Sequence, residues 1–206
     1  MKLIKNAAVL VPDKDKRLIR NGYIAIEGSL ISDIGDMKDL TQETLDKTSE
    51  VIDAKGKIAI PGFVSTHSHL YSAVVRSIPH QGYGDEDQCF ASWMERFWLS
   101  LLEDKVNRQD VYAGTLINCI ENIKHGFTTT SDTVEGSYAL PGALFEAGRA
   151  ASDAGIRGVL SFETTGHISE ENSKLGLAEN VEFIEQCKKD PENRIQGAVG
   201  DRKSVV

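Results

Sequence analysis

From Pro61 onward, short apolar runs alternate with longer amphipathic stretches, and this rhythm constrains the fold more than any other feature. Strands that alternate with helices favour βα units and a parallel sheet over an antiparallel one. The expected strands are 58–67, 127–133, 157–165 and 194–200, and the expected helices are 89–106, 110–126, 139–155 and 175–190. The sequence therefore predicts an α/β fold with about four βα units.

The helix expected over 110–126 has the strongest local signals. Its apolar residues Ala113, Ile117, Ile120 and Ile123 fall on one helical face. Asp110 is a candidate cap, and Gly126 is a stop signal. His125 lies in the last turn, where a cation suits the helix dipole, so helix capping is favoured over catalysis for this histidine.

The first sixty residues have a different pattern, with short β-branched runs separated by polar turns that contain glycine. Alternation before Gly28 and Ser29 predicts a hairpin. We therefore expect a small β-sandwich module over 1–60 and barrel-type βα units over 61–200. A closed (β/α)8 TIM barrel needs eight strands and roughly 250 residues, so the second region is expected to be the first half of one.

The last six residues, DRKSVV, break the pattern of the fourth expected strand. They are the translation of GAT CGG AAG AGC GTC GTG, the beginning of a common short-read sequencing adapter. We interpret 201–206 as adapter read-through and expect a truncated chain whose natural protein continues beyond Gly200. The other interpretation is an ordinary solvated tail. Sequencing the locus from an independent library distinguishes the two.

The composition of the chain narrows the classes of partner that it is expected to bind. The 206 residues carry 23 Lys and Arg against 31 Asp and Glu, a net charge of −8, which argues against nucleic-acid and anionic-membrane surfaces. Small-molecule substrates are the expected partners, and a homo-oligomer is left open. The first residues are too polar for a signal peptide, so we expect a cytoplasmic protein. Cys89, Cys119 and Cys187 are expected to be thiols without a disulfide.

Two histidines, His67 and His69, stand one residue apart where the first expected barrel strand ends. Residues two apart on a strand point to the same face, so both imidazoles can reach one metal ion. The ends of barrel strands are where active sites assemble in this architecture, and neutral imidazole is a common ligand of zinc. A His-x-His pair alone is weak evidence, because two ligands do not fill a tetrahedral site.

The stretch VIDAKGKIAIPGFVSTHSHLYSAVVRSIP resembles the metal-dependent amidohydrolase superfamily, in the branch of cytosine and guanine deaminases and chlorohydrolases. The segments SHLYSAVVRSIP, ENIKHGFTTTSDT and AGIRGVLSFETT look most like the SsnA-like aminohydrolases. The resemblance spans about 2–200, and the segment around His67 and His69 is its most specific part.

The resemblance implies one divalent metal, with zinc ahead of iron, held by His67 and His69 together with a histidine and an aspartate from later strands. Binuclear relatives bridge two metals with a modified lysine on the fourth strand, and RIQGAVG contains no lysine. The remaining ligands and the acid/base groups are expected beyond Gly200. A metal ion lowers the pKa of bound water, which can then attack an electrophilic carbon.

Five further residues are candidates for the substrate pocket: Tyr71, Arg76, Asp132, Glu163 and His167. Tyr71 and Arg76 follow the histidine pair, and Arg76 could grip a carboxylate or a ring oxygen. Asp132 and Glu163 stand at the ends of the second and third expected strands. Each could equally pack, bond neighbouring backbone amides or remain in water.

Other polar and aromatic residues receive more ordinary interpretations. Trp93 and Trp98 could stack on a heteroaromatic substrate, but core or interface packing is favoured. Glu103 and Asp104 lie near the end of the helix expected over 89–106 and could contact substrate, and a solvated helix end explains them equally well. His80 lies in a polar, glycine-rich loop, where a solvated histidine is favoured over a lid residue.

The implied function is a metal-dependent hydrolase of carbon–nitrogen bonds other than peptide bonds. An aminohydrolase or deaminase of a heterocyclic or amide substrate is the first expectation, and a chlorohydrolase-type dehalogenase is the second. A different class stays open, namely a noncatalytic binding protein or a dead fragment. The chain as printed is expected to be inactive by itself, because half a barrel leaves unpaired strand edges.

Overall fold

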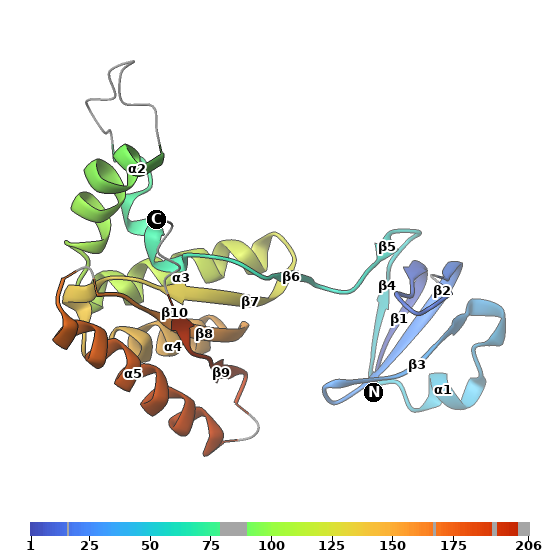
Figure 1. The fold of residues 1–206 in the computed structure, drawn as a ribbon. Coiled ribbons are helices and arrows are strands. Elements are labelled where there is room, and N and C mark those ends of the chain that lie inside the picture. Colours follow the sequence, from blue (N-terminus) through green and yellow to red (C-terminus); the bar gives the residue numbers. More distant parts are fainter. Residues whose placement is uncertain (16, 79–89, 167, 191–192, 202–206) are drawn as a thin grey trace. The chain divides into compact units, whose positions relative to one another are not determined.

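The computed structural model describes residues 1–15, 17–78, 90–166, 168–190 and 193–201. The chain divides into two compact units, Met1–Pro61 and Gly62–Val206 (Figure 1). Three residues discussed above, His80, Cys89 and His167, lie outside the described residues. Within the described ranges, every helix is too short or too polar to cross a lipid bilayer.

The N-terminal unit is built on one five-stranded sheet. Its elements are β1 (Lys2–Leu10), β2 (Leu18–Glu27), β3 (Leu30–Asp36), the short helices η1 (Met37–Asp39) and α1 (Gln42–Asp46), β4 (Glu50–Asp53) and β5 (Ile58–Ala59). β2 pairs antiparallel with both β1 and β3, while β4 and β5 lie parallel to β1. Leu3, Tyr23 and Ala25 form its buried cluster. The predicted hairpin at Gly28 is confirmed, since Gly28 has a φ of 59° between β2 and β3.

The second unit is an α/β layer with parallel strands, as the alternation predicted (Figure 1). Its strands are β6 (Phe63–Ser65), β7 (Phe127–Val134), β8 (Arg157–Thr164), β9 (Ile195–Gly197) and β10 (Gly200–Asp201). β7 lies between β6 and β8, and both β9 and β10 pair with β8. Its helices are η2 (Leu70–Val75), α2 (Phe90–Trp93), η3 (Met94–Glu103), α3 (Arg108–Lys124), η4 (Ser137–Ala139), α4 (Ala143–Ala154) and α5 (Glu170–Lys188).

The prediction of one continuous strand over 58–67 is wrong. The segment is split between the two units, because β5 pairs with β1 whereas β6 pairs with β7. Pro61, at the break, has no backbone N–H to donate to a ladder. At Gly62, an added Cβ would lie only 2.2 Å from the Thr128 side chain, so the backbone approaches β7 where only glycine fits.

Helix α3 confirms the predicted helix but not its cap or its buried face. Asn107 is the N-cap and Asp110 completes a capping box with it, while His125 is the C-cap as predicted. The apolar stripe from which the helix was predicted is exposed. It consists of Ala113, Ile117, Ile120 and Ile123. The buried face carries small residues instead, because at Gly114 an added Cβ would lie 2.2 Å from the Tyr71 carbonyl oxygen.

The other helices show similar shifts of boundary. The segment 89–106, predicted as one α-helix, is described from Phe90 as one turn of α-helix followed by the π-helical η3. Helix α5 begins at Glu170, five residues before the predicted start, and the Ser169 side chain caps it. Gly155 ends α4 as predicted, with a φ of 82°.

The core of this unit lies between the sheet and α3, α4 and α5. Its largest buried side chains include Tyr71, Leu102, Leu144, Leu160 and Phe162. Cys119 and Cys187 belong to this core as buried free thiols, as predicted for them. Packing of this kind fixes the carboxyl ends of β6, β7 and β8, where the candidate site residues are found.

Candidate metal centre at the strand ends

His67 and His69 lie side by side just after β6. Their ring centroids are 5.0 Å apart and the ring planes are nearly perpendicular. Ser68, between them, points to the other side and donates from Oγ to the Ser131 carbonyl oxygen of β7 at 2.7 Å. The two imidazoles are therefore close together in the bend that follows β6, as their spacing predicted.

The His69 ring is held through its Nδ1 atom. Nδ1 lies 3.1 Å from the Thr133 carbonyl oxygen and 3.3 Å from Oε1 of Glu135. Both neighbours are hydrogen-bond acceptors, so the neutral ring carries its proton on Nδ1. The lone pair is then on Nε2, which is the atom that this tautomer offers to a metal.

Glu135 follows β7 directly, and its second oxygen receives two more donors. Tyr71 Oη donates to Oε2 at 2.8 Å, and Trp98 Nε1 donates to the same atom at 2.7 Å. The two aromatic rings also flank His69, with centroids 6.3 Å and 5.7 Å from the imidazole. One carboxylate thus connects η2, η3 and the end of β7 around one histidine.

Two further buried carboxyl groups, those of Glu103 and Glu163, lie within hydrogen-bonding range of Glu135. Burial raises the pKa of Glu135, but the hydrogen bonds from Glu103, Glu163 and Trp98 and the nearby His69 outweigh it and lower the pKa to about 2. These contacts therefore favour the ionised form of Glu135. The interpretation of Glu103 as a solvated helix end is wrong, since only 2% of the residue is exposed.

Asp132 lies on the opposite face of β7 from Thr133. It shares its buried face with Thr130 and Val134, and its Oδ1 accepts from the Leu70 backbone N–H at 2.7 Å. Burial raises its pKa to about 7, and the charge of Glu135 adds to this effect. Its other oxygen, Oδ2, has no hydrogen-bond partner within the described residues. Asp132 thus anchors the segment that follows the histidine pair.

The remaining candidate residues are distributed as follows. Tyr71 is fully buried, and burial together with Glu135 raises its pKa well above the usual range. Arg76 donates to Asn118 Oδ1 on α3 at 2.8 Å, and Asn118 in turn donates to the Leu70 carbonyl oxygen. Glu163 ends β8 and lies beside Glu135. The pocket roles of Tyr71, Arg76, Asp132, Glu163 and His167 stay predictions.

Sequence reasoning missed Glu135 and assigned Trp98 to packing. A signal for Glu135 was present in the sequence. By alternation along β7, Glu135 falls on the same side as Thr133 and on the side opposite the buried Asp132. Strand parity, applied to the first residue after the strand, would have selected Glu135 ahead of Asp132. Nothing local to the sequence indicates that Trp98 Nε1 reaches this carboxylate.

The two imidazoles would suit part of a zinc site. Two neutral imidazoles, one with its tautomer fixed by acceptors, are suitable zinc ligands. Among the residues that the structure describes, there is no group of three or more His, Cys, Asp or Glu side chains arranged to hold a metal. His67 and His69 therefore fit a metal that takes its other ligands from outside this set.

The described unit combines parallel βα units with a His-x-His pair just after its first strand, a combination that suits a partial metal site in a TIM-barrel-type fold. The model of the amidohydrolase family matches residues 58–205. The chain belongs to the amidohydrolase family.

Characterised relatives extend the comparison. The 5'-deoxyadenosine deaminase of Methanosarcina acetivorans is 32% identical over 199 residues, which cover 96% of this chain and 41% of that protein. The 5-methylthioadenosine/S-adenosylhomocysteine deaminase of Thermoanaerobacter pseudethanolicus is 34% identical over 174 residues, 84% of this chain and 35% of that protein. The chain spans less than half the length of these curated relatives.

A solved structure supports the fold. Atrazine chlorohydrolase TrzN of Arthrobacter aurescens, complexed with zinc, superposes with a TM-score of 0.75 at 24% identity. The match covers 98% of this chain and 46% of that one. The α/β fold class predicted from the sequence is confirmed.

Proposed function

We propose that the protein is a metal-dependent hydrolase of carbon–nitrogen bonds other than peptide bonds, and that it acts as an aminohydrolase. The observation that carries the proposal is the state of His69, whose Nδ1 faces two acceptors and whose Nε2 is left for a metal beside His67. Membership of the amidohydrolase family supports it independently.

In this proposal His67 and His69 hold one divalent ion, with zinc preferred to iron. A zinc ion would supply Lewis acidity and lower the pKa of a bound water molecule toward about 7. The zinc in the chlorohydrolase structure supports the choice of metal. The chain's own contribution is to orient the two imidazoles and to surround them with buried acceptors.

The substrate class we propose is a heterocycle with an exocyclic amine. The two curated relatives are named as deaminases of adenosine derivatives, in which an amine is attached to an aromatic ring carbon. The chlorohydrolase displaces chloride from a related kind of carbon, so dehalogenation is the second candidate. Deamination is preferred because the deaminases are the more similar sequences. A cytoplasmic location and a homo-oligomer stay predictions.

The test uses protein expressed from the complete open reading frame of the locus. We expect about one zinc or iron per chain by elemental analysis, and release of ammonia from a panel of aminopurine nucleosides. The double variant His67→Ala, His69→Ala should lose both the metal and turnover.

The matched control is His125→Ala, because His125 is an exposed C-cap residue on α3. This control should keep the metal and the activity. A wild-type protein that is metal-free and releases no ammonia would support the noncatalytic alternative.

A further inference from the structure

We propose that Glu135 is a positioning residue whose carboxylate fixes His69 in the tautomer and orientation that a metal ligand requires. The inference rests on the proposed function, because it assigns a role relative to the metal that His69 would hold. It concerns a residue that neither the sequence pattern nor the family comparison assigned.

The first argument is the geometry around Nδ1. The Thr133 carbonyl oxygen and Glu135 Oε1 approach this atom at 3.1 Å and 3.3 Å. Metal-bound histidines commonly donate their other N–H to a carbonyl or a carboxylate, which fixes the tautomer and raises the basicity of the ligating nitrogen. Glu135 and the Thr133 carbonyl therefore fix the tautomer together, and a donor in place of Glu135 Oε1 would oppose a proton on Nδ1.

The second argument is that Glu135 is itself held in place. Tyr71 and Trp98 donate to Oε2 at 2.8 Å and 2.7 Å, which leaves Oε1 directed at the imidazole. The Tyr71 backbone is in turn packed against Gly114 of α3, where no Cβ would fit. A carboxylate with both oxygens assigned has little freedom to rotate away from His69.

The third argument concerns the unfavourable free energy of burying a carboxylate. The Glu135 side chain is only 7% exposed, and burying a carboxylate is unfavourable unless other groups compensate. Stability alone would be served by an apolar residue of similar volume. A carboxylate that accepts from Tyr71 and Trp98 and lies 3.3 Å from His69 Nδ1 is therefore accounted for by its effect on that ring.

Glu135→Gln is the decisive variant. The amide oxygen can still accept from Tyr71 and Trp98, and the amide nitrogen then presents a donor to Nδ1 where the carboxylate presented an acceptor. We expect zinc affinity, measured by competition with a chromophoric chelator, to fall about 10–100-fold. We also expect His69 in the metal-free variant to shift toward the Nε2–H tautomer, observed by long-range ¹H–¹⁵N NMR at pH 8.

Glu179→Gln is the matched control. It replaces a buried carboxylate on α5 that accepts from the backbone N–H groups of Gly142 and Leu144, and the amide oxygen can still accept one of these bonds. Zinc affinity and the His69 tautomer should be those of the wild type. Thermal unfolding of each metal-free variant shows whether the fold has been kept.

Conservative changes at the donors separate positioning from packing. Tyr71→Phe removes one of the two bonds to Oε2 but keeps the ring, so zinc affinity should fall less than in Glu135→Gln. Glu135→Gln with wild-type zinc affinity, or a wild-type His69 protonated on Nε2, would overturn the inference.

These outcomes are distinguishable from failure of the proposed function. A wild-type protein that binds no zinc removes the proposed function, whereas the NMR result in the metal-free protein still tests the role of Glu135. The wild type could instead bind zinc and turn over substrate while Glu135→Gln does both equally well. That result would contradict only the inference about Glu135.

Discussion

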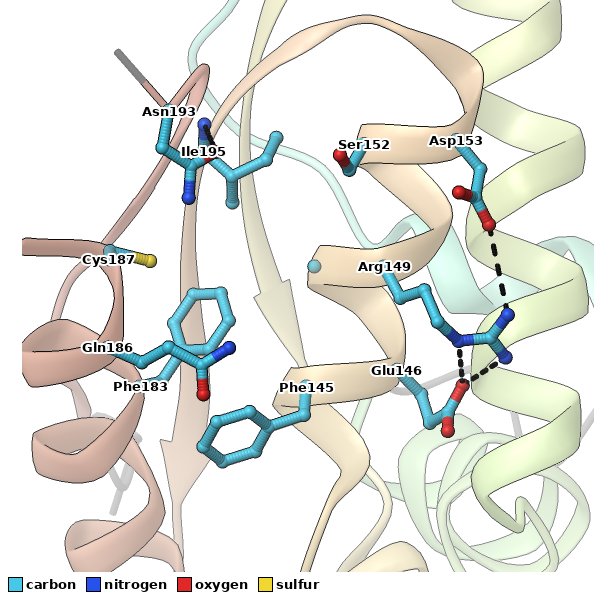
Figure 2. Close-up of a pocket in the computed structure, with 11 residues that line it drawn as sticks. Phe145, Glu146, Arg149, Ser152, Asp153, Phe183, Gln186, Cys187, Asn193 and Ile195 are labelled. Carbon is cyan, nitrogen blue, oxygen red and sulfur yellow. Dashed lines mark hydrogen bonds and ion pairs between the residues drawn. The ribbon is translucent and has the colours of Figure 1, made fainter. Parts of the chain in front are cut away.

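The second unit has two regions where charged and aromatic side chains meet, and they differ in kind. The groove between α4 and α5 has a volume of about 420 Å³ and is lined by the rings of Phe145 and Phe183 together with polar and charged side chains (Figure 2). Its charges pair with each other at the surface, since Arg149 contacts Glu146 at 2.5 Å and Asp153 at 3.7 Å. These three side chains are between 31% and 54% exposed.

At the ends of β6 and β7 the polar groups are buried and converge on one imidazole. Glu135 receives donors from Tyr71 and Trp98 and faces His69, and two more carboxyl groups lie beside it. The groove is a well-defined hollow, but its charges have solvent and each other as partners. The proposed function therefore rests on the burial and convergence of polar groups at the strand ends, and the volume of the groove plays no part in it.

The largest expected effect that sharpens this contrast is the pH dependence of stability conferred by Asp132. The pKa of the Asp132 carboxyl is about 7 in the folded state, compared with its ordinary value of 3.8. Below pH 3.8 the carboxyl is therefore protonated in both the folded and the unfolded state, and its contribution to the free energy of unfolding is fully present. Between about pH 4 and 7 only the unfolded state releases the proton, and the free energy of unfolding falls by about 4 kcal/mol. Above pH 7 the contribution is constant.

Chemical denaturation of the wild type and of Asp132→Asn from pH 4 to 8 measures how the free energy of unfolding depends on pH. The difference between the two curves should grow through the window and then level off. Parallel curves would show that Asp132 is solvated, and the contrast with the exposed groove would be lost.

Two glycines provide the next comparison, because each lies inside a helix and faces a close neighbour. At Gly114, by the strand ends, an added Cβ would meet the Tyr71 backbone oxygen at 2.2 Å. At Gly148, in the groove, it would meet the Phe183 ring at 2.7 Å, and a side chain can shift more readily than backbone. The gain in helix propensity, about 1 kcal/mol, is common to both substitutions.

We therefore expect Gly114→Ala to destabilise the protein by about 2–3 kcal/mol and to weaken zinc binding through Tyr71. Gly148→Ala should change stability by no more than about 1 kcal/mol and leave zinc binding intact. Denaturation midpoints and chelator competition measure both quantities. The reverse order of the two variants would contradict the packing described for Tyr71.

The smallest effect is expected at Arg149. Its guanidinium lies 3.7 Å from the centroid of the Tyr112 ring and pairs with exposed carboxylates, and interactions of this kind contribute little in water. Arg149→Ala should leave zinc affinity and turnover unchanged and lower the unfolding temperature only slightly. A loss of activity would show that the groove, rather than the strand ends, serves the reaction.

Sequence patterns predicted much of the fold, because periodicity is a local property. The alternation of strands and helices, the helix that ends at His125 and the hairpin at Gly28 all follow from short-range signals. The break between β5 and β6 did not, because it depends on which partner strand each half finds. The exposed stripe of α3 was misjudged for a similar reason, since the close contact of Gly114 with Tyr71 decides which face is buried.

The candidate site was predictable only in part. The His67 and His69 spacing is informative by itself, because residues two apart in an extended segment share a face. The link from Trp98 through Glu135 to His69 joins three elements far apart in the sequence, and no local pattern encodes it. The burial of Glu103 likewise depends on how η3 packs after its π-helical turns.

The central claim is that His67 and His69 ligate one metal ion, and X-ray absorption spectroscopy of the zinc-loaded protein from the complete open reading frame tests it most directly. The account predicts imidazole nitrogens at about 2.0–2.1 Å from zinc in the wild type, and no bound zinc in the His67→Ala, His69→Ala variant. An unchanged imidazole contribution in a variant that still binds zinc would contradict it.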